Sequence, residues 1–471
     1  MQLTIFDETT EKNILSEIFL STKLGKYYSS LPLEELSNLL PKRSANQKGV
    51  KGWLTNKGKI ALQFLKPYLN ISDEKLLARL NSDWQLQYFC GIRLSIGERI
   101  RDKNLIWQTR KYVATTLKEQ GISSFQEVLI TAWKPHLNHN ETKIGMSDAT
   151  CYESHIKYPT DVELIWDCIL WLRGEIKNIC YNLKIPVPRT KFNQQKKRHL
   201  AYMRRRRKFK KETRKRCKQS LYLCNKMIGQ LKSLLIDVTL KAKTKENEQL
   251  LSPTFSETFS ETFSERFQLI QKVYKQQEEH YENPSESIPN RIVSLYKSYI
   301  RPIVRGKTNK RVEFGAKVNT WQVGGLNFIE HLSFNAFHEG IRLKQGIALH
   351  TKHFGKPTQI AADKIYATNE NRSHCKNLDI QTNFIPKGRR TQNPTKRKQE
   401  DKARQELGKA RATVLEGTYG NDKNHYGLQK IKARNQITEV AWIFFGMMAA
   451  NAMKIVNKIK AAKVKTTKSP P

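Results

Sequence analysis

The feature that most constrains the fold is an interruption in an otherwise regular alternation of strands and helices. Strand-like periodicity appears at "KIGMSDATCYES", and it becomes clear again only at "KRVEFGAKVNTWQVGG". The glycine pair that ends this second segment, Gly324 and Gly325, predicts a hairpin to the strand that follows. Between them, residues 161–291 carry apolar residues three and four apart, which is the spacing of amphipathic helices. Without this segment, the order is strand, hairpin, helix, strand, helix, strand, helix. That order predicts a mixed α/β sheet with a helical insertion between its first and second strands.

The flanking segments complete a four-part organisation. Residues 1–140 have helical periodicity throughout, which suits a DNA-binding or dimerisation module and equally a plain helical bundle. The sheet domain is expected at 141–160 plus 292–436, with the helical insertion at 161–291. Residues 437–471 are expected to form a C-terminal helix and a basic tail. The apolar run "VAWIFFGMMAANAM" within it is shorter than the ~20 residues that span a bilayer, so we expect a buried helix.

The charge of the chain indicates a polyanionic partner. It has 84 Lys and Arg against 43 Asp and Glu, a formal net charge of +41. Such an excess is self-repelling unless a polyanion neutralises it, and nucleic acid is a better candidate than an anionic membrane. A purely structural basic protein is the remaining alternative, but such proteins are usually smaller and poorer in tryptophan than this chain, which has eight.

The positive charge is densest in the insertion. Residues 189–218 hold 16 Lys and Arg and one acid, Glu212. We expect a run of four arginines in this segment to bind DNA phosphates, because the insertion begins shortly after Asp148 in the sequence. The alternative is a solvated helical hairpin whose charge only aids solubility. The run consists of Arg204, Arg205, Arg206 and Arg207.

Cysteine usage indicates a reducing compartment. The seven cysteines are scattered and include no CxxC pair, which argues against a disulfide framework. Cys217 and Cys224 with His199 make a poor zinc site, because no second close pair exists. The N-terminus lacks a basic region followed by an apolar core. We therefore expect a cytoplasmic, nucleoid-associated protein that does not bind membranes.

Three acidic residues carry the candidate chemistry. Asp148 and Asp363 each follow a short apolar run, "IGMS" and "TQIAA", so both are expected at the C-terminal end of a strand, where side chains enter a crevice. If those strands are neighbours, the two carboxylates face each other, and a hard divalent cation with oxygen ligands would relieve their repulsion. Glu416 would complete the shell of a second ion. A lone Asp after a strand is more often a turn former or a helix cap.

The stretch after Glu416 adds a row of cations. If it is one helix, Glu416, Lys423, Lys430 and Arg434 lie within about 40° of one face. That face would place an acid at the metal ions and the cations along a phosphate backbone. Gly417, Gly420 and Gly427 weaken a continuous helix.

These motifs together resemble the DDE transposases of bacterial insertion sequences, which carry a helical N-terminal domain before an RNase H-like catalytic domain. The matching segments are "SDATCYESHIKYPTD", "RPIVRGKTNKRVEFGAKV", "ADKIYATNENR" and "LEGTYGNDKNHYGLQKIKAR". The family's Glu–x6–Lys signature is met by Glu416 and Lys423. Its arginine four residues before the glutamate is replaced by Ala412, and Arg411, one place earlier, is the candidate DNA-binding residue here. The tyrosine that precedes this arginine is not evident, and Tyr419 is a candidate substitute.

The resemblance implies a function and a set of roles. Asp148, Asp363 and Glu416 would ligate two Mg²⁺ ions, with Mn²⁺ as a substitute, and Lys423 would contact a transposon-end phosphate. The implied activity is cleavage of double-stranded DNA at terminal inverted repeats and joining of the 3′-hydroxyl ends to target DNA, by a homodimer. Two alternatives remain: a catalytically silent, transposase-derived DNA-binding protein, and an RNase H-like nuclease without strand transfer.

Overall fold

Strand β1 (Ile144–Ser154) is the centre of a mixed sheet in the computed structural model, which describes residues 8–42, 52–95, 97–243, 261–304, 311–388 and 392–466. The chain divides into two compact units, one formed by residues 1–155 and 305–471 and the other by residues 156–304. Helices and the sheet together confirm the mixed α/β class.

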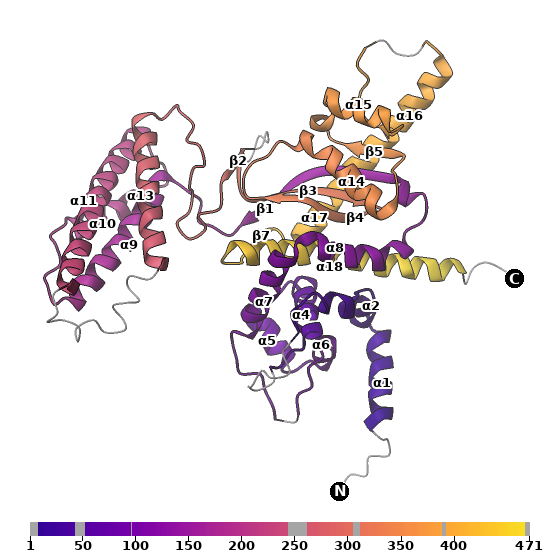
Figure 1. Ribbon diagram of the computed structural model, residues 1–471, viewed down its shortest axis with the longest axis horizontal. Coiled ribbons are helices and arrows are strands. Elements are labelled where there is room, and N and C mark those ends of the chain that lie inside the picture. The colour runs from indigo at the N-terminus through magenta and orange to yellow at the C-terminus, as the bar shows by residue number, and fades with distance from the viewer. Residues whose placement is uncertain are drawn as a thin grey trace, which may run out of the picture. The chain divides into compact units, whose positions relative to one another are not determined.

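The sheet of the first unit combines parallel and antiparallel pairs around β1 (Figure 1). β1 pairs antiparallel with β3 (Val312–Val323) and parallel with β5 (Gln359–Ala362). The remaining pairs are β3 with β4 (Leu326–Ser333), antiparallel, β5 with β6 (Gln381–Thr382), parallel, and β1 with β7 (Lys430–Ile431), parallel.

The β3–β4 connection is the predicted glycine hairpin. Gly324 and Gly325 have φ of 57° and 83°, a conformation that a two-residue hairpin requires and that glycine adopts without a Cβ clash. A register shift between Asn319 and Thr320 interrupts the pairing with β4. Such a bulge bends the strand at the residues opposite Asp148 and Ala149.

Helices cover both faces of this sheet. Trp321 of β3 packs against Gly346 of α14, whereas the adjacent Thr320 bonds to Tyr419 of α17. Because neighbouring residues in a strand point to opposite faces, α14 and α17 lie on opposite sides of the sheet. The helices of this part are α14 (Leu343–Phe354), α15 (Asn369–Asn377), α16 (Pro394–Ala410), α17 (Glu416–His425) and α18 (Gln436–Thr466).

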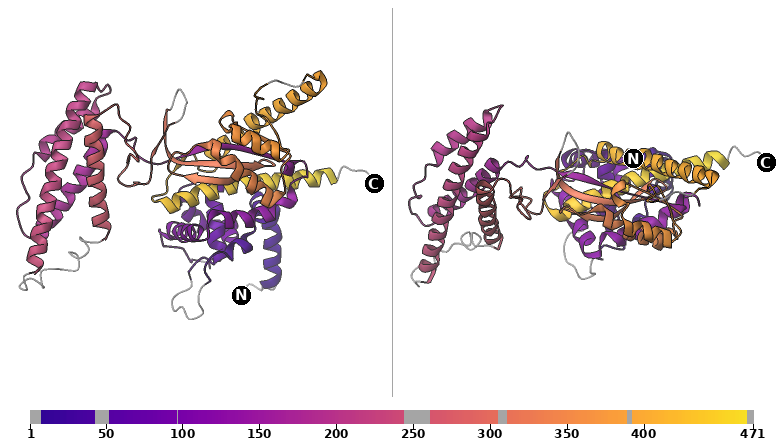
Figure 2. Two further views of the ribbon diagram at one scale, coloured as in Figure 1. Left: turned by 45° about the horizontal axis from the view of Figure 1, so that its top comes forward. Right: turned by 90° about the horizontal axis from the view of Figure 1, so that it is seen from above.

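Helix α18 lies between the sheet and the N-terminal helices (Figure 2). It contacts β4 on one side and α4 and α7 on the other. By length and composition α18 passes as a membrane span, but 72% of its most apolar window is buried inside the protein, as expected of a core helix. The N-terminal helices are α1 (Glu8–Ser21), α2 (Lys23–Ser29), α3 (Leu33–Ser37), α4 (Asn56–Leu69), α5 (Asp73–Leu80), α6 (Trp84–Cys90), α7 (Leu105–Gln120) and α8 (Ile122–Trp133).

The second unit is a helical bundle with its own core. Apolar side chains of α9, α11 and α13 form one buried cluster, and His199 of α10 stacks on Trp166 of α9 at 4.3 Å between ring centroids. The unit also holds β2 (Pro302–Val304). Its helices are α9 (Asp161–Asn182), α10 (Phe192–Arg204), α11 (Lys210–Lys243) and α13 (Glu261–Glu282).

Candidate active site

Asp148 lies in β1 and Asp363 directly follows the neighbouring strand β5, at the same level of the sheet. The parallel register of β1 and β5 ends with Ser147 opposite Ala362, and each aspartate is the next residue of its chain. Asp363 follows its strand as expected. Asp148 does not end its strand, because β1 continues to Ser154 by pairing with β3. The expectation of a strand end was therefore wrong for Asp148, which instead lies where its β5 neighbour stops.

Asp363 also acts as a cap. Its Oδ1 accepts a hydrogen bond from the amide of Lys364 at 2.7 Å, at the start of a short 3₁₀ turn from Lys364 to Tyr366. Its side chain nevertheless remains 48% exposed, so the capping bond leaves part of the carboxylate accessible. The structural role and an additional ligand role are therefore compatible at this residue.

Glu416 reaches the two aspartates from a helix that contains a π-helical turn. Helix α16 runs into the π turn Arg411–Leu415, and α17 begins at Glu416. The segment before this turn forms the regular helix α16, because the side chain of Asn393 caps it and Pro394 occupies its first position. Single π turns within α-helices are frequent at functional sites.

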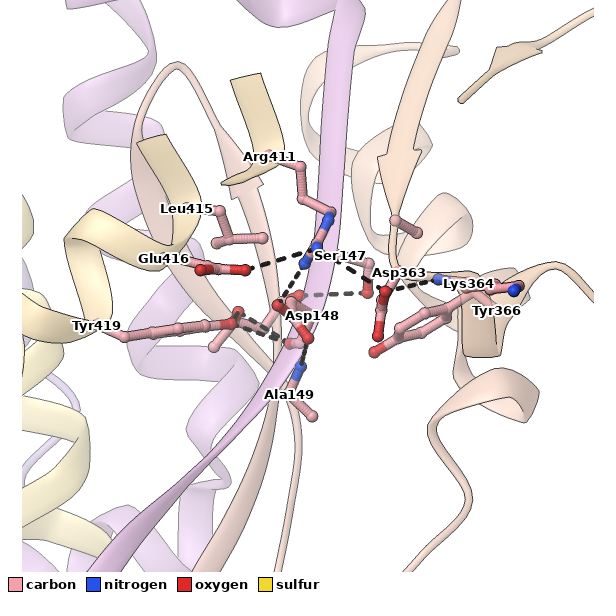
Figure 3. Close-up of polar contacts among 12 residues, drawn as sticks. Ser147, Asp148, Ala149, Asp363, Lys364, Tyr366, Arg411, Leu415, Glu416 and Tyr419 are labelled. Atoms are coloured by element: carbon pink, nitrogen blue, oxygen red, sulfur yellow. Dashed lines mark hydrogen bonds and ion pairs between the residues drawn. The ribbon is translucent and has the colours of Figure 1, made fainter. Parts of the chain in front are cut away.

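The three carboxylates converge on one guanidinium, that of Arg411 (Figure 3). Arg411 Nη1 donates to Asp148 Oδ2 at 2.9 Å. Its Nη2 lies 3.5 Å from Glu416 Oε1 and 3.8 Å from Asp363 Oδ1. The structure thus brings all three predicted acids around a single positive charge, although they come from three separate segments.

The acids differ in their exposure to water. Asp148 is 15% exposed, whereas Glu416 is 57% exposed. Burial raises the pKa of Asp148 to about 6, although its bond from the amide of Ala149 and the nearby Arg411 act in the opposite direction. The carboxylates of Glu339 and Asp363 raise it further. A buried carboxyl with this pKa gains free energy from any cation brought close to it.

Alternate residues of β1 hold α17 in place. Tyr419 donates to the backbone oxygen of Asp148 at 3.0 Å and also bonds to the hydroxyl of Thr320. Two further contacts follow at positions 150 and 152, where Lys423 donates to Thr150 Oγ1 at 3.1 Å and Tyr152 donates to Asp422 at 3.2 Å. The contacts at positions 148, 150 and 152 join β1 to α17. Because β1 carries Asp148 and α17 begins at Glu416, these contacts fix the two acids relative to each other.

A polar network supports the β5 side of the site. Tyr366, three residues after Asp363, bonds to Asn319 of β3, and Asn319 donates to Glu330 at 2.8 Å. Arg342 also binds Glu330. Sequence reasoning did not identify these residues, because no spacing links them. Among the segments that resemble the transposase family, only "ADKIYATNENR" contains one of these residues, Tyr366.

The carboxylate oxygens of the three acids suit a hard divalent cation, although the side chains are not arranged around a common metal position in this structure. Carboxylate oxygens are the preferred ligands of Mg²⁺, and Asp148, Asp363 and Glu416 supply them. In the described part of the chain, no cluster of three His, Cys, Asp or Glu side chains is arranged to hold a metal ion. The position between the acids is taken by the Arg411 guanidinium, so an ion can enter only if that side chain withdraws.

The predicted DNA contacts divide into two groups. Lys423 lies on α17, but Lys430 lies in β7 and Arg434 precedes α18, so the expectation of one helical face was wrong. The helix ends because Gly427 takes a φ of 70°, which no α-helix accommodates. All three nevertheless line one cleft. The other group, Arg204 to Arg207, is exposed in the second unit, where Arg205 pairs with Glu212 and Arg207 stacks on Phe209.

Comparison with known proteins agrees with this geometry. Residues 360–451 match the family model described as transposase DDE domain. The match begins three residues before Asp363 (363 − 360) and also includes Arg411 and Glu416, whereas Asp148 lies outside it. Neither the curated proteins nor the solved structures gave a match to this chain. The resemblance to DDE transposases is therefore confirmed by residues 360–451, which are similar to a transposase DDE domain.

Proposed function

We propose that this chain is a transposase that cuts DNA at the terminal inverted repeats of an insertion sequence and joins the 3′-hydroxyl ends to target DNA. The observation that carries the proposal is the convergence of Asp148, Asp363 and Glu416 on one point. Carboxylates from three distant segments repel one another unless positive charge lies between them. In a chain of net charge +41, the substrate that supplies both a reactive phosphodiester and counter-charge is DNA.

The three acids would hold two Mg²⁺ ions, for which Mn²⁺ would substitute. Two such ions, when bound, activate the attacking oxygen and stabilise the leaving oxygen of an in-line displacement at phosphorus. The protein's own contribution is to hold the acids at the level where β1 and β5 meet. Tyr419 acts here as a positioning residue, because its hydroxyl binds the backbone of Asp148 while its helix carries Glu416.

Arg411 fits the role of the family's arginine in spite of its displaced sequence position. In an α-helix, residues four apart lie on one face, whereas a π turn brings residues five apart together. Arg411 is five residues before Glu416 and lies 3.5 Å from it, because the π turn accommodates the extra residue. In the catalytic state we expect its guanidinium to leave the acids and to bind a DNA phosphate, for which its planar fork is suited.

The test is metal-dependent cutting by variants of the three acids. Asp148→Asn, Asp363→Asn and Glu416→Gln should each abolish cutting of a duplex that carries the element's terminal repeat, while DNA binding remains close to that of the wild type. Glu406→Gln on the exposed face of α16 is a matched control and should cut normally. Near-normal cutting by any one acid variant in Mg²⁺ would remove that residue from the proposed site.

A catalytically silent DNA-binding protein is the second candidate. The observation in its favour is that the Arg411 guanidinium lies among the three acids, beside the oxygens that would ligate a metal ion. A nicking assay with the wild-type protein, with and without Mg²⁺, separates the two candidates. Nicking without joined products would instead indicate an RNase H-like nuclease that lacks strand transfer.

The proposal extends to the organisation of the chain. It includes an RNase H-like catalytic domain at 141–160 plus 292–436, DNA binding or dimerisation by residues 1–140, and phosphate contacts from Arg204 to Arg207 in the insertion. It also includes a homodimer that holds two transposon ends, and a cytoplasmic location where chromosomal DNA is accessible.

A further inference from the structure

A basic cleft lies in the first unit between the N-terminal helices and the segment that follows Glu416. Its volume is about 680 Å³. Seven of its nineteen lining residues are Lys or Arg, and Asp73 is the single acid among them. The α4–α7 region contributes Lys66, Lys103 and Arg110, whereas Lys423 comes from α17. The segment after α17 contributes Lys430, Lys432 and Arg434.

The floor of the cleft carries buried positive charge in excess. Lys66 and Arg110 are 10% and 7% exposed, and both bind the same oxygen of Asp73, at 2.7 and 2.8 Å. One carboxylate therefore compensates two cations. Burial lowers the pKa of Lys66, although Asp73 acts against this shift, and Arg110 and Lys432 lower it further. Because uncompensated charge is costly away from water, a bound anion would stabilise this floor.

The floor is also held in a fixed arrangement. The Arg110 guanidinium lies 4.7 Å from the centroid of the Trp442 ring, and the Trp442 indole donates to the oxygen of Gly427 at 3.1 Å. Cation–π packing of this kind orients the guanidinium without using its N–H donors. Lys66 additionally bonds to the oxygen of Ile71. The cations are thus positioned in advance of any ligand, which lowers the entropic cost of binding.

The rim carries a regular row of exposed cations. Lys430, Lys432 and Arg434 alternate with the buried Ile431 and Ala433. In an extended strand such as β7 (Lys430–Ile431), alternate side chains point in the same direction, about 6.5 Å apart, and here the alternation of exposed and buried residues continues to Arg434. Such a row suits a linear polyanion better than a single small anion.

Lys423 connects the cleft to the acids. It lines the cleft, and it binds Thr150, two residues beyond Asp148 in β1. It also belongs to the helix that begins at Glu416. A polyanion that lies in the cleft can therefore continue along α17 towards the three carboxylates.

We propose that this cleft binds the sugar–phosphate backbone of duplex DNA next to the reacting phosphodiester. Lys66, Lys103, Arg110 and Lys432 are the phosphate-binding residues that it adds to those expected from the sequence. The N-terminal helices and the segment after Glu416 then hold the same DNA, so neither half forms the site alone. This inference rests on the proposed function for the identity of the polyanion.

The test measures DNA affinity against salt without divalent metal. A labelled duplex is titrated with the Lys103→Gln/Lys432→Gln variant, whose substitutions lie on the exposed rim, between about 50 and 200 mM KCl. Binding should be about tenfold weaker at the low-salt end, and the slope of log affinity against log salt should fall by about 2. The control is Lys356→Gln/Lys376→Gln, which removes the same charge from exposed positions that do not line the cleft.

Each outcome decides the inference. An unchanged slope, or equal slopes for the variant and the control, overturns it. If inorganic phosphate raises the melting temperature of the wild type but not of the variant while DNA affinity stays equal, the cleft binds a free anion and the DNA proposal is wrong. If the salt slope falls in the variant but the wild type does not cut DNA in Mg²⁺, the cleft proposal is supported and the proposed function is rejected. If the wild type cuts DNA but the salt slope of the variant is unchanged, the proposed function is supported and the cleft proposal is rejected.

Discussion

The guanidinium of Arg411 and the carboxylate of Asp148 form a 2.9 Å ion pair in which both side chains are more than four-fifths buried. The same guanidinium lies within 4 Å of Glu416 and Asp363. Arg411 therefore stabilises the cluster in the metal-free state, and it competes with any divalent ion for the same oxygens. Stability without metal and affinity for metal are consequently opposed at this residue.

Replacing Arg411 by Gln should separate these two effects. In EDTA the variant should be less stable by about 1–3 kcal/mol, because the buried carboxylate of Asp148 loses its charged partner. Adding Mn²⁺ should raise the melting temperature of the variant more than that of the wild type, since no side chain must withdraw. Arg404→Gln is the control, because Arg404 pairs with Asp401 on the neighbouring helix α16. An equal Mn²⁺ shift in Arg411→Gln and wild type would show that Arg411 does not compete with the ion.

Deleting Ala412 should leave the site largely intact. The π turn contains one residue more than an α-helical turn, so the deletion can restore a continuous α-helix without rotating α16 against α17. Arg411 would then stand four residues before the glutamate and still reach it. We expect this variant to retain most DNA cutting.

Deletion of Gly420 provides the contrast. It removes one residue from regular α-helix and turns Lys423 by about 100° away from Thr150. Cutting should fall at least as far as in Lys423→Gln. If the two deletions impair cutting equally, deletion of Ala412 does not convert the π turn into regular α-helix with the site preserved.

The sequence predicted the parts of this site that depend on local pattern. Strand-like runs located Asp148 and Asp363, and the glycine pair at 324–325 located the hairpin, because period and turn chemistry are encoded in neighbouring residues. The position of Arg411 beside all three acids could not be read in this way. It depends on the π turn Arg411–Leu415, which brings a residue five places before Glu416 beside that glutamate.

The residues that line the basic cleft could not be grouped from the sequence either. Lys430 and Arg434 were assigned to DNA binding on a helical face that does not exist, since Gly427 ends the helix. They share a cleft with Lys423 only because β7 pairs with β1 and α18 packs against α4 and α7. Two segments more than 300 residues apart that line one cleft, such as those of Lys66 and Lys430, leave no local signal in the sequence (430 − 66 = 364).

Gly346 should tolerate no side chain. A Cβ there would lie 2.1 Å from the ring of Trp321, and the ring is closed in on its other side by Gly145, where a Cβ would lie 2.4 Å away. The ring is also fixed by a 3.0 Å hydrogen bond from its indole to His350. Gly346→Ala should therefore destabilise the protein by about 1–3 kcal/mol, in spite of the better helix propensity of alanine.

The matched control for this substitution is Gly408→Ala. Gly408 lies in helix α16, and a Cβ there meets nothing within 4 Å. This change should stabilise the protein by up to about 1 kcal/mol. Thermal unfolding of the two variants beside the wild type measures both effects. A rise in melting temperature for Gly346→Ala would mean that Trp321 can move, contrary to its close packing.

Asp422 should make stability depend on pH. Burial raises its pKa to about 7, against the opposing effect of the nearby Lys454. Since the folded-state pKa lies above the unfolded value near 4, the contribution of this group to stability is complete below pH ~4 and is lost as the pH rises to about 7.

Asp422→Asn lacks this titration and can still accept the hydrogen bond from Tyr152. Its free energy of unfolding, measured in urea, should therefore rise relative to that of the wild type by up to about 1.4 kcal/mol per pH unit across this window. Asp102→Asn, at an exposed carboxylate, is the control for the loss of one negative charge. A constant difference between Asp422→Asn and wild type from pH ~4 to ~7 would mean that Asp422 is already ionised in the folded protein.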